Sequence, residues 1–425
     1  MLEELPALAG SLMPASRGRP VAVLTDRVIK RRAGSELLPL VEELLGGPGR
    51  VRVIALAGGE GGRVHADAPT IERVAVEAKG AAGLVTVGSG TLADIGKAAS
   101  AALSGLPHVV VQTATSVNGF TDDQSVLLVK GVKRTTHTRW PDALVADAEV
   151  LLGAPPALNL AGAGDLAAMF TAPADWQLAH ALGMTDSYSA IVVDMVRIHG
   201  QEVLAAAGRV AHDPAAVTTL ADVLALSGIS MGVAGTTAPA SGMEHTVSHL
   251  IEMAMNRRGR EAAYHGAMVG VTSILAARLW SKVRARLEAD PRPSLSFPSA
   301  DVMDARVHDA FAALDPSGEM GEECWRLYAK KLQRWTANRE RLEGVDWQSI
   351  AAQAGTHLIE PSELAVALGS AGAPVHLSQL DPPVDAELAR WALSNCHLMR
   401  DRFTVADLAF FMGMWEAGAI DDVLS

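Results

Sequence analysis

Between residues 20 and about 150, short runs rich in β-branched residues alternate with helical stretches. Five such runs are PVAVLT, RVRVIAL, GLVTV, HVVVQT and SVLLVK. Valine-rich strands with helices between them are typical of βαβ units, which build a mostly parallel sheet. The pattern predicts an α/β domain over residues 1–150.

Strand-like runs end at about residue 151, and helical periodicity continues from there to the C-terminus. The expected helices span residues 165–182, 186–207, 244–255, 262–288, 322–342 and 385–402. We therefore predict a second, all-helical domain over residues 151–425. The chain is 49% hydrophobic and 20% charged, so it can bury two substantial cores.

Composition limits the partners and the compartment. A formal net charge of −12 argues against nucleic acid and anionic membranes. The longest uncharged run, 223–243, has too much Gly, Ser, Thr and Pro for a bilayer span and predicts a buried helix followed by a turn. Cys324 and Cys396 are too few for a disulfide framework, and the N-terminus does not resemble an export signal. We expect a cytoplasmic protein with a small-molecule substrate.

A glycine-rich turn follows the third strand-like run, in LVTVGSGTLADIGKAAS. Gly88, Ser89 and Gly90 precede a helix that is expected to begin near residue 91. Thr91 and Asp94 then have the spacing of an N-cap and its N3 partner. Such a turn lets a diphosphate approach free backbone N–H groups. However, the spacing is not a complete G-x-G-x-x-G and the turn does not follow the first strand, so an ordinary tight turn is the alternative.

Polar side chains are also expected at the ends of two other strands. Thr113, Thr115 and Ser116 follow the fourth run, at the carboxyl end where open α/β sheets bind ligands, although Ser and Thr also serve in ordinary turns. Asp26, at the end of the first run, is a candidate for the adenosine ribose of NAD. The neighbouring Arg27 would favour NADP instead, and helix capping is the alternative role for Asp26.

Three residues of the helical half form a candidate metal site: Asp165, His245 and His265. One carboxylate and two imidazoles suit a divalent ion such as zinc and leave a position open for a substrate oxygen. Taken singly, each has an ordinary alternative as a helix cap or a core residue. His245 and His249 are four residues apart and therefore share a helix face. Because Glu244 precedes the first histidine, the HExxH pattern of a metalloprotease is absent.

Together these motifs resemble the glycerol-1-phosphate dehydrogenase group. That group belongs to the superfamily of iron-containing alcohol dehydrogenases, glycerol dehydrogenases and dehydroquinate synthases. The matching stretches occur in family order over most of the chain: VGSGTLADIGK, GVK, ALVADAEVL, AGAGDLAAMFTAPADW, SGMEHTVSHLIEM, YHGAMVG and HLMRDRFTVADLAF. The resemblance implies the dehydroquinate synthase-like architecture, with an N-terminal nucleotide-binding α/β domain, an all-α C-terminal domain and an active site in the cleft between them.

The resemblance also implies roles for individual residues. The metal-ligand positions are matched by Asp165, His245 and His265, and the ion is usually zinc, with iron(II) or nickel(II) as alternatives. Positions that hold NAD or NADP are matched by Gly88, Ser89, Gly90, Asp94, Thr113 and Ser116. A bound divalent ion lowers the pKa of a ligated hydroxyl, which favours hydride release to the nicotinamide. In the reducing direction, solvent or His249 then protonates the product oxygen. A homo-oligomer is left open.

Several positions depart from the family pattern. Asn118, a candidate catalytic residue with His249, stands in SVNGF where relatives commonly carry Asp; a neutral turn substitution is the alternative. Met169 and Phe170 replace Lys and Tyr in AAMFTAPADW, and Ala267 is less polar than its family counterpart. The metal ligands thus remain while their surroundings lose charge.

We therefore expect an oxidoreductase that acts on a small alcohol, ketone or aldehyde, phosphorylated or phosphonylated, other than glycerol 1-phosphate. One alternative is a sugar-phosphate cyclase of the dehydroquinate synthase type, which the loss of basic residues disfavours. The other alternative is a non-catalytic relative that binds a partner or a nucleotide.

Overall fold

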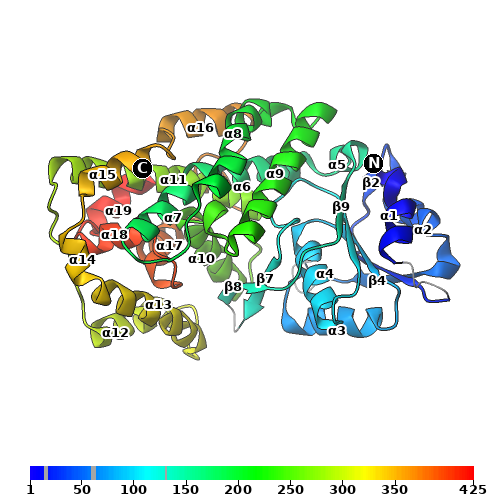
Figure 1. Ribbon diagram of the computed structural model, residues 1–425, viewed down its shortest axis with the longest axis horizontal. Helices are drawn as coiled ribbons and strands as arrows, with labels where there is room; N and C mark the ends of the chain where they lie inside the picture. The colour runs from blue at the N-terminus through cyan, green and yellow to red at the C-terminus, as the bar shows by residue number, and fades with distance from the viewer. Residues whose placement is uncertain (14–17, 59–63, 130–131) are drawn as a thin grey trace. The chain divides into compact units, whose positions relative to one another are not determined.

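The computed structural model describes residues 1–13, 18–58, 64–129 and 132–425 of the chain. Lys130 and Gly131, which belong to the SVLLVK and GVK stretches, lie outside the described residues. The chain forms two compact units (Figure 1). The α/β unit comprises Met1–Val129, Lys133–Ala163 and Gln201–Val233, and the helical unit is built mainly from Gly164–Gly200 and Ala234–Ser425. The domain boundary at residues 150 and 151 stays a prediction.

A five-stranded parallel sheet forms the centre of the α/β unit. Its strands are β1 (Val21–Asp26), β4 (Val51–Leu56), β5 (Leu84–Gly88), β6 (His108–Gln112) and β9 (Ala143–Ala146). They lie in the order β4-β1-β5-β6-β9, and each neighbouring pair is parallel. Numbered along the chain, this order is 2-1-3-4-5, which reverses between β1 and β5. Open α/β sheets bind ligands outside the carboxyl ends of strands at such a reversal.

The expected α/β fold is confirmed, but one strand was assigned wrongly. The run SVLLVK lies in β7 (Gln124–Val129), which pairs with β8 (Val132–His137) in a separate two-stranded sheet. The parallel sheet takes the four-residue β9 as its fifth strand, and a strand this short carries little alternation for sequence analysis to detect. Strands β2 (Arg31–Arg32) and β3 (Ser35–Glu36) form a further small antiparallel pair.

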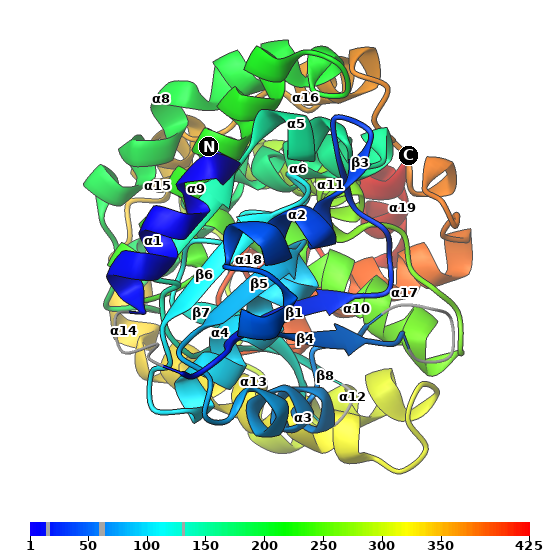
Figure 2. The same ribbon diagram turned by 90° about the vertical axis from the view of Figure 1, so that its right-hand side faces the viewer.

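Helices cover both faces of the parallel sheet (Figure 2). The alternate strand residues Val21, Val23, Val85 and Val109 pack with α1 (Leu5–Leu12) and α2 (Leu37–Leu44). The residues between them, such as Ala22, Leu24 and Leu84, pack with α3 (Ala68–Ala78) and α4 (Gly90–Ala102). Successive strand residues point to opposite faces, so strands buried on both sides become continuous apolar runs. The remaining helices of this unit are η1 (Leu2–Glu4), η2 (Pro48–Arg50), α5 (Ala148–Leu152), η4 (Ala207–Arg209) and α9 (Pro214–Ala234). Helix α6 (Pro156–Leu166) begins in this unit, and its last three residues, from Gly164, belong to the helical unit.

Helix α9 contains the first part of the uncharged run. Among the described helices it is the one long and apolar enough to cross a membrane by length and composition, and 56% of its apolar window is buried within the protein. Its backbone accepts a hydrogen bond from Thr121 Oγ1 to the carbonyl oxygen of Ala225 at 2.6 Å. A single, mostly buried helix is weak evidence for a membrane span. The chain turns after Ala234, as the composition of the run predicts.

After β9, no described residue lies in a strand, which confirms the all-helical C-terminal half. The longer helices are α7 (Ala172–Ala181), α8 (Ala190–Ala206), α10 (Met243–Arg257), α11 (His265–Ala289), α12 (Ala300–Ala312), α13 (Glu319–Ala337), α15 (Trp347–Gly355), α16 (Pro361–Ser370) and α17 (Ala386–Asn395). The shorter ones are η3 (Ala167–Phe170), η5 (Ala238–Ala240), α14 (Arg339–Glu343), η6 (Leu377–Gln379), η7 (Cys396–Leu398), α18 (Val405–Phe411) and α19 (Ala417–Leu424).

The helix expected over 165–182 is interrupted. Helix α6 ends at Leu166, the tighter helix η3 follows, and α7 starts after Thr171, whose backbone φ of −138° is not helical. Pro173 stands in the first turn of α7, where its missing N–H is tolerated. The single helix predicted here is therefore wrong, because apolar periodicity continues across the break.

The core of the helical unit surrounds α11. Residues on all sides of this helix are buried, including Trp280, which is typical of a helix enclosed by others. Trp335 of α13 stacks on Phe411 with ring centroids 4.4 Å apart and on Phe403 at 5.4 Å. These rings join α13 to the C-terminal segment around α18.

Asp147 joins the N-terminus of α5 to Arg32. Its carboxylate accepts hydrogen bonds from the backbone N–H groups of Glu149 and Val150. The Arg32 guanidinium donates to both of its oxygens, each at 3.2 Å. Burial would raise the pKa of Asp147, but these hydrogen bonds and the charge of Arg32 outweigh burial and lower the pKa from its ordinary value. The ionised form is therefore the one that the fold stabilises.

We predict that Asp147→Asn lowers the free energy of unfolding by about 1–3 kcal/mol at neutral pH, because the amide cannot pair with the guanidinium. The folded-state pKa is the lower one, so the wild-type advantage is present above the ordinary pKa of 3.8 and is lost as the pH falls through the folded-state value. Urea unfolding at pH 7 and near pH 3 measures this change. Asp67→Asn, at the N-cap of α3, is the control, because Asn caps as well as Asp. If Asp147→Asn lowered the free energy of unfolding equally at both pH values, the lowered folded-state pKa of Asp147 would be contradicted.

Candidate metal and cofactor sites

Two helices of the helical unit approach each other through glycines. A Cβ atom on Gly164 would lie 2.3 Å from the carbonyl oxygen of Gly266, and one on Gly270 would lie 3.0 Å from the Cα of Gly164. A side chain at Gly164 would therefore force α6 and α11 apart. Asp165 follows Gly164, and His265 precedes Gly266. The close approach thus brings these two ligand candidates together.

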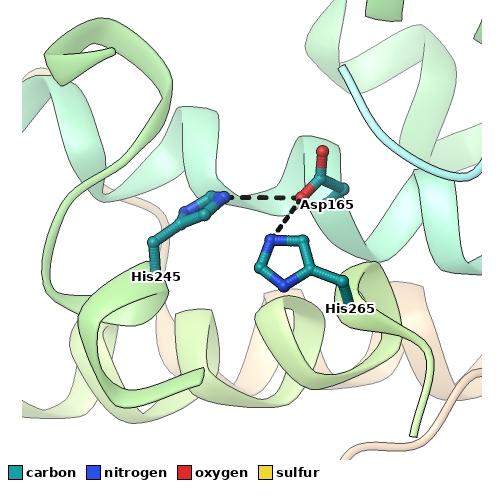
Figure 3. Close-up of side chains that lie close together, drawn as sticks. All are labelled: Asp165, His245 and His265. Carbon is teal, nitrogen blue, oxygen red and sulfur yellow. Dashed lines mark ion pairs between the residues drawn. The ribbon is translucent and has the colours of Figure 1, made fainter. Parts of the chain in front are cut away.

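Asp165 lies between two imidazoles (Figure 3). Its Oδ1 atom is 3.4 Å from Nε2 of His245 and 3.8 Å from Nε2 of His265. Asp165 and His245 are buried, whereas the side chain of His265 is 23% exposed. In tetrahedral zinc sites with bonds of about 2 Å, ligand atoms lie about 3.3 Å apart. The three side chains that the sequence singled out therefore fit a divalent cation with little movement.

A carboxylate holds each imidazole on its other nitrogen. Nδ1 of His245 lies 3.0 Å from Oε1 of Glu244, and Nδ1 of His265 lies 3.2 Å from Oε2 of Glu252. When Nδ1–H donates to a carboxylate, the lone pair remains on Nε2, the atom that faces Asp165. Metal-binding histidines are commonly oriented in this way. The donor set and its surroundings therefore fit a metal ion.

The electrostatics also favour a cation here. Burial would lower the pKa of His245, but the hydrogen bonds and charges of Asp165 and Glu244 outweigh burial and raise the pKa to about 9. Burial would raise the pKa of Glu244, but His245 and the backbone N–H of Gly242 lower it below its ordinary value. A metal ion at this site would replace the proton on His245, so binding would release a proton.

Asp175 connects the helices that carry these ligands. Its Oδ2 accepts from the backbone N–H of Met243, at the start of α10, at 2.8 Å. Its Oδ1 accepts from the N–H of Val405, at the start of α18, at 2.9 Å and from Nε1 of Trp280 on α11 at 3.0 Å. Burial and the charge of Glu244 raise the pKa of Asp175 well above its ordinary value. This one carboxyl group thus links α7 to α10, α11 and α18.

His249 shares the helix face of His245, as predicted, with ring centroids 6.0 Å apart. Its ring stacks on His265 at 5.1 Å, and its Nδ1 lies 2.8 Å from Nη2 of Arg400 in a buried contact. The atoms of His249, Glu252 and His265 also lie within 4.8 Å of one another. In that group, however, Glu252 already accepts from His265 Nδ1, and a guanidinium stands beside His249.

The residues that depart from the family pattern fill apolar space. Met169 and Phe170 are both buried in η3. A Cβ atom on Gly200 of α8 would lie 2.4 Å from Cε of Met169 and 3.3 Å from Cζ of Phe170. Ala267 is partly buried against the helical core. Packing thus accounts for these side chains, and their effect on a substrate stays a prediction.

In the α/β unit, the cofactor candidates gather at the carboxyl ends of three adjacent strands. Asp26 ends β1, Gly88 ends β5, and Thr113 and Ser116 follow β6. Although β5 is the third parallel strand in the chain, it lies beside the first. The glycine turn that follows it therefore stands at the reversal of strand order, although it does not follow the first strand of the chain as an ordinary dinucleotide-binding fingerprint does.

Helix α4 begins at Gly90 with Ser89 as the N-cap, and no side chain caps it. The predicted pairing of Thr91 as N-cap with Asp94 at N3 is therefore wrong. Asp94 instead accepts from the backbone N–H of Val126 at 3.2 Å. The first N–H groups of α4 thus have no side-chain cap, an arrangement that suits an anionic ligand.

A buried lysine on α4 fixes the neighbouring loop. Lys97 is fully buried and lies 2.5 Å from Asp122 and 3.1 Å from Asp94. It also donates to the carbonyl oxygens of Gly119 and Gln124. These contacts hold the SVNGF turn.

The other polar candidates have structural contacts of their own. Asn118, in the SVNGF turn, donates from Nδ2 to Ser227 Oγ at 3.2 Å. Thr115 donates through its backbone N–H to Asn159 Oδ1 on α6 at 3.0 Å, a long-range contact and not the local hydrogen bond of a turn.

Asp26 does not cap a helix. Its Oδ1 accepts from the backbone N–H of Val28 at 2.9 Å and from Lys30 Nζ at 2.5 Å. The alternative of helix capping is therefore wrong, and the local structure is a turn closed by a lysine.

Four residues around the candidate metal site were not predicted from the sequence to be site residues: Asp175, Glu244, Glu252 and Arg400. The two glutamates flank the histidines in EHTVSHLIEM, so acidic residues on a histidine-bearing helix were an available signal. Asp175 and Arg400 lie far along the chain from the residues they contact, and no local pattern marks them.

A parallel sheet with an uncapped glycine turn at its reversal and an Asp-His-His cluster in the helical unit are the features expected of a metal- and dinucleotide-dependent class of protein. Residues 3–155 match the model of the iron-containing alcohol dehydrogenase family. This part of the chain is therefore similar to that family.

Its relatives in sequence include two glycerol-1-phosphate dehydrogenases (NAD(P)+). The one from Bacillus licheniformis is 29% identical over 404 residues, which cover 95% of this chain and 84% of the relative. The one from Geobacillus stearothermophilus is 29% identical over 381 residues, 86% of this chain and 81% of the relative. Among solved structures, a probable glycerol dehydrogenase from Sinorhizobium meliloti has the same fold, with a TM-score of 0.60, 17% identity and coverage of 98% of this chain and 96% of that chain.

We predict that His265→Ala abolishes metal retention, because it removes one of three ligands and the partner of Glu252. Elemental analysis after zinc loading and dialysis should find less than about a tenth of the wild-type zinc. His308→Ala is the control, since His308 lies on α12 and outside both groups of ligand candidates. Unchanged zinc content in His265→Ala would defeat the ligand assignment.

Glu252→Gln tests the carboxylate behind His265. The amide keeps the shape but loses the charge that orients and polarises the imidazole, so we expect the zinc dissociation constant to rise about 10–100-fold. Competition with a chromophoric chelator measures it. Glu288→Gln, an exposed glutamate near the end of α11, should leave the constant unchanged. Equal affinities in both variants would show that Glu252 has no such role.

Proposed function

We propose that this protein is a metal-dependent NAD(P)(H) oxidoreductase that interconverts a small phosphorylated or phosphonylated alcohol with its ketone or aldehyde. One observation carries the proposal: Asp165 stands between the Nε2 atoms of His245 and His265, and a carboxylate holds each ring from behind. Similarity to glycerol-1-phosphate dehydrogenases supports the reaction class and a phosphorylated substrate.

The proposed metal ligands are Asp165, His245 and His265. A divalent cation supplies Lewis acidity, which polarises a carbonyl in the reducing direction and favours the deprotonated alcohol in the other. Glu244 and Glu252 keep the two rings in the orientation that this requires. Nitrogen and oxygen donors in this number suit zinc, which we propose as the ion, with iron(II) and nickel(II) as alternatives.

For the dinucleotide, we propose that the diphosphate binds the turn at Gly88, Ser89 and Gly90 and the first N–H groups of α4. Thr113 and Ser116, at the end of the adjacent strand, are proposed to contact the cofactor or the substrate. Lys30 neutralises the carboxylate of Asp26, so the charge that would repel a 2′-phosphate is offset. We therefore propose that both NAD and NADP are accepted.

The compartment is proposed from the cysteines. Cys324 and Cys396 are both buried and are not joined in a disulfide, which is consistent with a reducing cytoplasm.

The substrate is proposed to be small and anionic, and different from glycerol 1-phosphate. Support comes from Met169 and Phe170, which occupy apolar space where the family pattern has a cation and a phenol. A polyol that binds through the cation and the phenol of the family pattern would lose those contacts here. A ketone or aldehyde with fewer hydroxyl groups would not depend on them.

A substrate panel tests the proposal. We predict that the zinc-loaded protein oxidises NADH or NADPH with a phosphorylated or phosphonylated ketone or aldehyde at least about tenfold more efficiently than with its unphosphorylated counterpart. Loss of absorbance at 340 nm, the nicotinamide band, follows turnover. Asp165→Asn should abolish turnover, and His308→Ala should not change it.

The other outcomes separate the alternatives. Release of inorganic phosphate with no net oxidation of the cofactor would identify a sugar-phosphate cyclase. Failure to bind zinc, whether or not a dinucleotide still binds, would identify a non-catalytic relative. If dihydroxyacetone phosphate gave the highest kcat/KM of the panel, the inference of a different substrate would be wrong.

A further inference from the structure

We propose that Arg400 is a positioning residue that holds His249 as its Nε2–H tautomer. His249 then donates a hydrogen bond to the reacting substrate oxygen, and it is neither a metal ligand nor the acid that protonates the product. The second part rests on the proposed function, whereas the tautomer does not.

The contact between the two side chains determines where the ring proton lies. Nη2 of Arg400 is 2.8 Å from Nδ1 of His249, and both residues are buried. A guanidinium has N–H donors and no acceptor, so Nδ1 must accept. In the neutral ring, the proton then resides on Nε2. A second proton would remove the acceptor and place one cation beside another in a buried site.

The segment that carries Arg400 is anchored on both sides. Buried Lys331 donates to the carbonyl oxygens of His397 at 2.6 Å and of Arg402 at 3.2 Å. The same lysine pairs with buried Asp407 at 2.6 Å. Arg400 therefore lies between two backbone groups held by one side chain, which limits its freedom of movement.

A second contact ties this segment to the helix of His249. Arg402 donates to the carbonyl oxygen of Ser241 and, at 2.6 Å, to Oγ1 of Thr237. Ser241 immediately precedes the N-cap of α10. The positions of the Arg400 guanidinium and the His249 imidazole relative to each other are thus fixed by contacts that involve neither side chain.

This arrangement argues against His249 as a metal ligand. A ring with its proton on Nε2 and its Nδ1 engaged by Arg400 has no lone pair to offer. The charged and titratable neighbours of the ring include His245, His265, Glu252 and Arg400. The carboxylate of Glu252 already accepts from Nδ1 of His265, and the guanidinium of Arg400 opposes a second cation beside His249. Of the two ligand groups, the one with Asp165 is therefore favoured.

The arrangement also assigns the final proton. In the reducing direction of the proposed reaction, a bound NAD(P)H would supply hydride to the carbonyl carbon and become NAD(P)+, and the carbonyl would become an oxyanion. The oxyanion takes a proton from water, which leaves hydroxide. A neutral imidazole that gave up Nε2–H would become an imidazolate, so His249 polarises the oxygen by hydrogen bonding instead. Of the two proton sources expected from the sequence, solvent is the one that fits.

The tautomer is tested without turnover. In zinc-loaded protein with 15N-labelled histidine, the His249 signals, identified by their loss in His249→Gln, should show a protonated Nε2 and an unprotonated Nδ1. Arg400→Met should shift them toward the other tautomer or the imidazolium. Arg326→Met, an exposed arginine on α13, should leave them unchanged. A protonated Nδ1 in the wild type would overturn the proposal, even if the protein turned over none of the substrates tested.

A double-mutant cycle tests the catalytic part. His249→Gln keeps an N–H donor that needs no arginine to orient it, so its kcat should fall by less than about tenfold. In His249→Ala, which has no donor, kcat should fall by about 10²–10³-fold while KM changes little. Arg400→Met should resemble His249→Ala, and Arg400→Lys should recover part of kcat. In the His249→Gln background, Arg400→Met should have almost no further effect.

Two results would overturn this part. Either Arg400→Met remains equally damaging in the His249→Gln background, or His249→Gln is as inactive as His249→Ala. Zinc content and the urea midpoint of each variant show whether a loss arises from the site or from the fold. Wild-type inactivity with an intact Nε2–H tautomer would instead refute the proposed function alone.

Discussion

The buried carboxyl group of Asp175 is the contact on which the candidate metal site depends. It accepts hydrogen bonds from the starts of α10 and α18 and from Trp280 on α11. Burying a carboxyl group is costly unless its oxygens find donors, and here three donors from three helices meet one side chain. The helices that it joins carry two of the proposed metal ligands, and the segment before α18 carries Arg400. A Cβ atom on Gly242 would lie 2.5 Å from Oδ2 of Asp175, so α10 can begin this close to the carboxyl group only with glycine there.

Two histidines on one helix are set to opposite roles by their Nδ1 partners. Nδ1 of His245 faces the carboxylate of Glu244, which leaves a lone pair on Nε2 for a cation. Nδ1 of His249 faces the guanidinium of Arg400, which places the proton on Nε2. The same residue type, one turn apart, thus provides a ligand and a hydrogen-bond donor. The sign of the charge behind each ring decides between them.

Several features of the fold followed from local patterns. Valine-rich runs predicted four of the five parallel strands, and helical periodicity predicted α10, α11 and α13 to within a few residues. The errors have local causes. Strand β9 is too short to show alternation, Pro173 interrupts a helix whose apolar pattern continues, and α4 starts one residue before the expected cap. The candidate metal ligands could be predicted from the sequence because each stands in a distinctive motif. The residues that hold these ligands from behind could not be predicted in this way.

The sequence by itself determined the kinds of element, the α/β and all-α halves and the resemblance to a family, because periodicity and motif spacing are properties of neighbouring residues. Only the tertiary structure decided which strand lies beside β1, which atom of each histidine faces Asp165, and that Arg400 meets His249. These features join segments far apart in the chain, 151 residues in the last case. They arise from helix packing at Gly164 and from buried hydrogen bonds such as those of Asp175 and Lys331. Such contacts depend on the distance and direction between side chains, which no local pattern of residues encodes.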